Sequence, residues 1–117
     1  MSYPTIRTVQ QQIVDGEIRL TDLVANHLNV IKKRNPDINA VTYFDESASL
    51  QKAEIIEQKI KAGTAGPLAG LVMGIKDAIC EEGKPATCAS EILKNFKSVY
   101  NATVIERLIA DDALLIA

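Results

Sequence analysis

The apolar run at residues 113–117 (ALLIA) constrains the fold most strongly. Five consecutive apolar residues suit a strand that is covered on both faces, as strands in parallel sheets are. A helical segment precedes this run, and residues 71–76 form an earlier apolar stretch with strand character. A strand, a helix and a second strand in this order are compatible with a right-handed parallel crossover. The sequence therefore predicts an α/β fold.

Apolar residues recur every three or four positions in three earlier stretches, which predicts three helices. Gly16 ends the first helix, and Thr21 is placed to cap the second. The cations at residues 32–34 suit the end of that second helix, just before Asn35 and Pro36. The expected apolar faces are Ile6, Val9 and Ile13; Leu23, Val24, Leu28 and Ile31; and Leu50, Ala53, Ile56 and Ile60.

Two further elements complete the expected fold. Residues 40–45 (AVTYFD) combine β-branched and aromatic side chains, which predicts a third strand. Residues 103–106 have the spacing of a capping box and open a helix expected to bury Val104, Ile105, Leu108 and Ile109. We expect one domain portion, residues 1–117, with a helical lead-in at 1–39 and an α/β segment at 40–117. A three-stranded sheet with bare edges is a poor independent fold, so we expect the opening part of a larger α/β domain.

Composition excludes several classes of function. The net charge is −2, so no global attraction draws the chain to nucleic acid or an anionic membrane. The N-terminus lacks the layout of a signal peptide, and no apolar run approaches the roughly 20 residues that a membrane span needs. The two cysteines, Cys80 and Cys88, form no CxxC pair and no cluster with histidine, which argues against zinc. We therefore expect a cytoplasmic protein with reduced thiols and no metal site.

Lys76 is the main candidate for chemistry, because it lies in the apolar segment 66–77 (GPLAGLVMGIKD). The period of two in a strand places Val72, Gly74 and Lys76 on one face. Burial of that face would disfavour the charged amine, lower the lysine pKa and make it usable as a base. The alternative is an ordinary strand-end lysine whose amine extends to water.

Other candidate groups have weaker support from the sequence. The glycines at 66, 70 and 74 do not form a phosphate loop, because Lys76 precedes aspartate rather than serine or threonine. Cys88 lacks a nearby histidine, and we expect it to be a buried small residue in a tight turn. His27, the only histidine, is expected to be a packed or half-exposed helix residue. Asp111 and Asp112 are expected to be a solvated pair, because no third metal ligand is evident.

Several linked segments resemble one family. Residues 66–77, followed by 86–96 (ATCASEILKNF) and 100–108 (YNATVIERL), are similar to the amidase signature family. The Thr-Cys-Ala-Ser and Asn-Ala-Thr-Val pieces resemble the branch that contains the A subunits of glutamyl-tRNA(Gln)/aspartyl-tRNA(Asn) amidotransferases. The resemblance covers nearly the whole chain and implies the N-terminal part of that family's fold, with helices on a mixed, mostly parallel sheet. Val72 and Ala78 depart from the proline and asparagine that are frequent at these positions in the family.

The resemblance also implies a mechanism. Lys76 would be the lysine of a Ser–cis-Ser–Lys triad, accepting a proton from a bridging serine that activates the nucleophilic serine. That nucleophile attacks the carboxamide of glutamine, an acyl-enzyme forms, and ammonia leaves. The ammonia would serve B and C partner subunits, which use ATP and Mg²⁺ to amidate mischarged tRNA; this chain itself would bind no cofactor.

The family places both catalytic serines beyond Ala117, and neither Ser90 nor Ser98 occupies those positions. We therefore expect the 117 residues alone to be inactive as a glutaminase. Two alternatives remain open at this point. The chain could be part of a stand-alone amidase, or a non-catalytic truncated protein that associates with itself through its strand edges.

Overall fold

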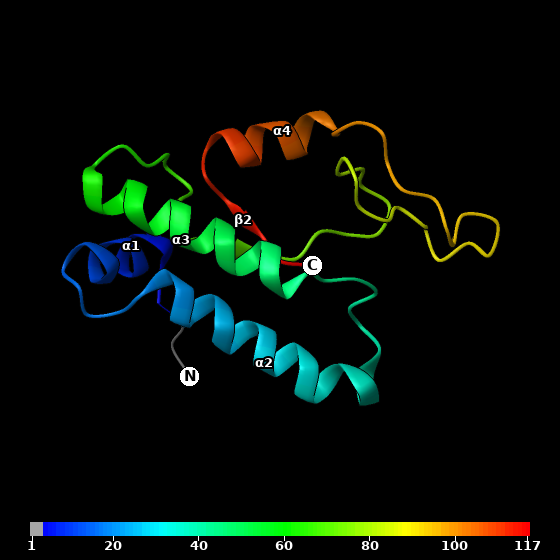
Figure 1. Ribbon diagram of the computed structural model, residues 1–117, viewed down its shortest axis with the longest axis horizontal. Coiled ribbons are helices and arrows are strands. Elements are labelled where there is room, and N and C mark those ends of the chain that lie inside the picture. The colour runs from blue at the N-terminus through cyan, green and yellow to red at the C-terminus, as the bar shows by residue number, and fades with distance from the viewer. Residues whose placement is uncertain (1–3) are drawn as a thin grey trace.

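The computed structural model describes residues 4–117, which form four helices and a small parallel sheet (Figure 1). In chain order the elements are α1 (Ile6–Val14), α2 (Leu20–Ile38), α3 (Glu46–Ala62), β1 (Val72–Met73), α4 (Thr103–Ala110) and β2 (Leu114–Leu115). Helix α3 packs against α1, α2 and β2, so it lies at the centre of the arrangement. The α/β class and the parallel pairing predicted from the sequence are both confirmed, with Val72 opposite Leu114 and Met73 opposite Leu115.

The hydrophobic core lies between the first three helices and β2. The predicted apolar faces of α1 and α3 are confirmed, because Val9 and Ile13 are buried, as are Ala53, Ile56 and Ile60. Helix α2 contributes Leu20, Val24 and Leu28, each with no exposed surface, and β2 contributes Leu114. The continuous apolar run of residues 113–116 is buried throughout, as a strand covered on both faces requires.

Both predicted boundaries of α2 are wrong. Thr21 lies inside the helix, whose N-cap is Arg19; the Thr21 amide and hydroxyl instead donate to the buried carboxylate of Glu57 at 3.3 and 3.4 Å. At the other end, the helix continues through Pro36 and stops at Asn39, which adopts a left-handed conformation with φ of 58°. Proline removes one hydrogen bond from the last turn without ending the helix there.

The strand predicted at residues 40–45 is also wrong, because these residues form an irregular connection between α2 and α3. The side chain of Asn35 accepts a hydrogen bond from the Val41 amide at 2.8 Å and donates one to the Val41 carbonyl at 2.7 Å. Asp45 caps α3 by accepting from the Ala48 amide at 2.9 Å. The Asn35 side chain therefore binds the Val41 backbone groups that a neighbouring strand would otherwise bind, and the β propensity of AVTYFD is overridden.

The remaining elements are shorter or less buried than expected. The strands predicted at 71–76 and 113–117 are regular over only two residues each, Val72–Met73 and Leu114–Leu115. The capping box is not formed, because Ala102 is the N-cap of α4 and offers no side-chain acceptor. Of the four α4 residues expected to be buried, Ile105 is buried and Leu108 is half-buried, whereas Val104 and Ile109 are exposed. No helix among residues 4–117 combines the length and apolar character that crossing a membrane requires.

Asp112 contradicts the expectation of a solvated acidic pair. Its side chain is buried, and it accepts hydrogen bonds from Lys59 Nζ at 2.7 Å and from the Gly66 amide at 2.8 Å. Burial raises the pKa of Asp112, but the bonds from Lys59 and Gly66 outweigh burial, so the net pKa is lowered. This carboxylate therefore ties α3, the loop before β1 and the start of β2 together.

Replacing Gly66 with alanine is expected to destabilise the fold by about 1–3 kcal/mol. The added Cβ would lie 2.6 Å from the carbonyl carbon and oxygen of Asp111, both of which are backbone atoms. Urea unfolding of the 117-residue chain would measure the loss. Gly74→Ala is the matched control, because its Cβ meets nothing within 4 Å and the change should be much smaller. Equal stability of Gly66→Ala and wild type would contradict the close approach.

Candidate functional site

Lys76 lies just beyond the carboxyl end of β1, next to the end of β2. The amide of the preceding residue, Ile75, donates to the carbonyl of Ala117 at 2.6 Å and continues the parallel pairing of the two strands. In α/β proteins with parallel strands, ligands bind outside the carboxyl ends of the strands. The lysine therefore occupies an edge of the sheet at which a binding site is expected on physical grounds.

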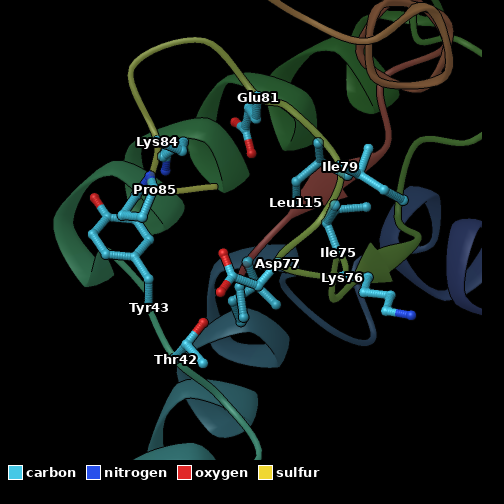
Figure 2. Close-up of a pocket in the computed structure, with 12 residues that line it drawn as sticks. Thr42, Tyr43, Ile75, Lys76, Asp77, Ile79, Glu81, Lys84, Pro85 and Leu115 are labelled. Carbon is cyan, nitrogen blue, oxygen red and sulfur yellow. The ribbon is translucent and has the colours of Figure 1, made fainter. Parts of the chain in front are cut away.

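The buried strand face expected for Lys76 is not found among the described residues. Strand β1 ends at Met73, so the two-residue alternation does not continue to the lysine. Gly74 and Lys76 are both exposed, and no ion pair joins Lys76 to a carboxylate within residues 4–117. Figure 2 shows the lysine amine pointing away from Asp77 and Thr42. The assignment of Lys76 as a catalytic base stays a prediction.

Two adjacent hollows lie beside this segment. The larger, about 440 Å³, lies between residues 40–43 and residues 74–77, and Ala117 also lines it. The smaller, about 40 Å³, extends from Ile75 and Asp77 toward Glu81 and Lys84 (Figure 2). Lys84 Nζ lies 5.2 Å from the centroid of the Tyr43 ring, within the range of a cation–π interaction. The larger hollow falls within the size range of small-molecule sites.

The Asp77 carboxylate binds Thr87, a contact that the sequence alone did not predict. Its Oδ1 accepts a hydrogen bond from the Thr87 amide at 2.7 Å, and its Oδ2 accepts one from the Thr87 hydroxyl. The bonds from the Thr87 hydroxyl and amide hold the pKa of the Asp77 carboxyl below its ordinary value. The polar Thr-Cys-Ala-Ser tract is the only sequence signal of this contact, because a separation of ten residues across a turn specifies no partner.

None of the other candidate residues lines the two hollows beside Lys76. His27 is exposed on α2, and Cys88 is exposed rather than buried, in the tight turn that the sequence predicted. Ser98 is buried and donates its hydroxyl hydrogen to the Tyr100 carbonyl at 2.7 Å. Within residues 4–117, no three His, Cys, Asp or Glu side chains cluster as a metal ion would require.

The amidase family model matches residues 22–117 of the chain. One similar protein is the A subunit of the glutamyl-tRNA(Gln) amidotransferase of Salinibacter ruber, which is 40% identical over 108 residues. The match covers 92% of this chain and 21% of that protein. The corresponding protein of Chlorobium chlorochromatii is 38% identical over 117 residues, covering 99% of this chain and 24% of the relative. The chain therefore spans about a fifth to a quarter of the length of these relatives.

Two solved structures of amidases resemble this chain in their fold. The native peptide amidase from Stenotrophomonas maltophilia matches with a TM-score of 0.88 and 22% identity, over 99% of this chain and 24% of that enzyme. A bacterial aryl acylamidase of the amidase signature family matches with a TM-score of 0.83 and 24% identity, over 98% of this chain and 24% of that one. At these identities the likeness shows the fold alone.

Proposed function

The chain belongs to the amidase family, and from this premise we propose that it is the N-terminal portion of the glutamine-hydrolysing subunit of a tRNA-dependent amidotransferase. The observation that carries the proposal is the 40% identity to the A subunit of a glutamyl-tRNA(Gln) amidotransferase over 92% of the present chain. The position of Lys76 at the carboxyl end of β1, beside a hollow large enough for an amino acid, supports it.

In the proposed reaction, Lys76 acts as the proton acceptor. Its neutral amine takes a proton from a bridging serine, which in turn takes one from the nucleophilic serine. The nucleophile attacks the carboxamide carbon of glutamine, and the proton held by Lys76 returns through the bridging serine to the departing nitrogen. The carbon–nitrogen bond breaks, and ammonia leaves an acyl-enzyme. Both serines would come from sequence that the 117 residues do not contain, so Lys76 is the only triad member proposed here.

Lys76 is exposed, whereas the proposed mechanism needs a neutral amine that is shielded from water. An amine has to be neutral to accept a proton, and surroundings that exclude water favour the neutral form. We propose that the part of the domain carrying the serines covers the carboxyl ends of β1 and β2. That cover would supply the low-dielectric surroundings that the 117 residues do not supply themselves.

Partner subunits belong to the same proposal. The ammonia would pass to B and C subunits in the cytoplasm, which would use ATP and Mg²⁺ to convert Glu-tRNA(Gln), or Asp-tRNA(Asn), to the amide. No cofactor is assigned to residues 1–117.

The 117 residues expressed alone are expected to release no ammonia from glutamine, because a proton acceptor without its nucleophile cannot cleave an amide. The complete subunit, purified with its B and C partners, should form Gln-tRNA(Gln) from Glu-tRNA(Gln) when glutamine and ATP are supplied. Ammonia release by the short chain that disappears in Lys76→Ala would contradict the proposal. Hydrolysis of simple amides by the complete subunit without partners would instead favour a stand-alone amidase. Sedimentation of the short chain tests self-association, which a clean monomer would exclude.

A further inference from the structure

Hydrogen bonds hold the two residues that flank Lys76, which are Ile75 and Asp77. On the N-terminal side, the Ile75 amide donates to the Ala117 carbonyl and fixes the segment to β2. On the C-terminal side, three bonds converge on Asp77. Two are those from the Thr87 amide and hydroxyl to its carboxylate, and the third runs from the Cys88 amide to its carbonyl oxygen at 2.8 Å.

The turn that Asp77 holds is conformationally costly. Cys88 and Ala89 are consecutive non-glycine residues with φ of 51° and 55°, in the left-handed region that side chains disfavour. Bonds from the Ser90 amide to the Thr87 carbonyl at 2.8 Å, and from the Ala89 amide to the Thr87 hydroxyl at 3.3 Å, close the turn on itself. Thr87 therefore joins a strained turn to Asp77, and the same hydroxyl serves both contacts.

From this geometry we propose that Asp77 is a positioning residue that fixes Lys76 for proton transfer by clamping the turn at residues 87–90. The inference rests on the proposed function, because it assigns Asp77 a task in that reaction. Backbone bonds hold this segment at Ile75 and at the Lys76 carbonyl, which accepts from the Ile79 amide at 2.9 Å. The bonds between Asp77 and Thr87 add its attachment to the turn at residues 87–90, and without them that attachment would weaken. A displacement of about 1 Å in a reacting group can cost roughly 100-fold in rate.

The clamp, meaning the pair of hydrogen bonds from Thr87 to the Asp77 carboxylate, acts through geometry rather than through the negative charge of Asp77. No ion pair joins Asp77 to Lys76 among the described residues, and Figure 2 shows their side chains pointing in different directions. Because the pKa of Asp77 is depressed, its contribution is complete above the ordinary value of 3.8 and is lost as the pH falls through the lowered value. The clamp is therefore constant across the neutral range.

The decisive variant is Thr87→Val, which removes the hydroxyl bond while keeping the shape of the side chain, the amide bond and every charge. In the complete amidotransferase we expect kcat for glutamine-dependent amidation to fall roughly 10- to 100-fold, with KM for glutamine within about twofold. Thr87→Ser keeps the hydroxyl and should restore most of the lost kcat. Thr103→Val is the matched control, because Thr103 is exposed at the start of α4 and remote from Asp77 in sequence.

Asp77→Asn provides the second test. It retains one acceptor oxygen but replaces the other with a donor amide, so one of the two Thr87 donors loses its carboxylate acceptor, and kcat should fall by a similar factor at every pH from about 6 to 9. A shifted pH profile at unchanged maximal kcat would mean that the charge matters and would overturn the proposal. Unchanged kcat in Thr87→Val, or equal losses in Thr87→Val and Thr103→Val, would also overturn it. Lys76→Ala separates the two inferences: if it lowers glutamine use while Thr87→Val does not, the proposed function stands and the positioning role fails.

Discussion

Under the proposed function, Lys76→Ala in the complete protein is expected to lower kcat for glutamine-dependent amidation by roughly 100- to 10,000-fold, the range for loss of a general base. The amine would be the group that takes the proton from the serine pair, and alanine cannot replace it. The measurement is the rate of Gln-tRNA(Gln) formation at saturating glutamine. Amidation with an ammonium salt in place of glutamine should continue, because free ammonia bypasses the step proposed for Lys76.

The ammonium reaction distinguishes a chemical loss from a structural one. If Lys76→Ala also abolished amidation with ammonium, the residue would be needed for folding or assembly rather than for proton transfer. Lys97→Ala is the matched lysine control, because Lys97 is exposed and forms no ion pair within residues 4–117. It should keep glutamine-dependent activity near the wild-type level. Retention of glutamine use by Lys76→Ala would remove the assignment of Lys76.

Leu114→Ala is expected to lower the free energy of unfolding by about 2–5 kcal/mol, the usual cost of removing a fully buried leucine. Leu114 has no exposed surface, belongs to the main core cluster and pairs with Val72 across the sheet. A domain is typically stable by only about 5–15 kcal/mol, so this loss is a large share of the total. Urea unfolding of the 117-residue chain measures it.

Ile92→Ala is the control for that measurement, because Ile92 is 94% exposed and its truncation leaves no cavity. Its effect should stay within about 0.5 kcal/mol, as for most surface changes. Equal losses in the two variants would contradict the placement of the core around β2.

The sequence predicted the buried faces of α1 and α3 because their apolar spacing matches the helical period and no tertiary contact overrides it. It also predicted the parallel pairing of the two apolar strands. The prediction for residues 40–45 was wrong because β propensity reports how side chains fit a sheet, and here Asn35 binds both backbone groups of Val41. Thr21 was wrongly predicted to cap α2, because the local sequence does not show that its partner, Glu57, lies on another helix.

The environment of Lys76 could not be predicted from local pattern. Strand alternation placed it on a buried face, but the strand ends three residues earlier and the lysine is exposed. The contact between Asp77 and Thr87 depends on how the intervening turn folds back, which neither residue encodes alone. Sequence pattern therefore locates the candidate site at Lys76, whereas only the three-dimensional arrangement reveals what holds it in place.

Val72 pairs with Leu114, which lies 42 positions later in the chain. Contacts between neighbouring helices close short loops and form early, whereas a parallel pairing over this distance waits for a long loop to close. During synthesis, the apolar segment around β1 leaves the ribosome well before its partner strand does. Until β2 arrives, that segment is an unpaired strand open to chaperones or to aggregation.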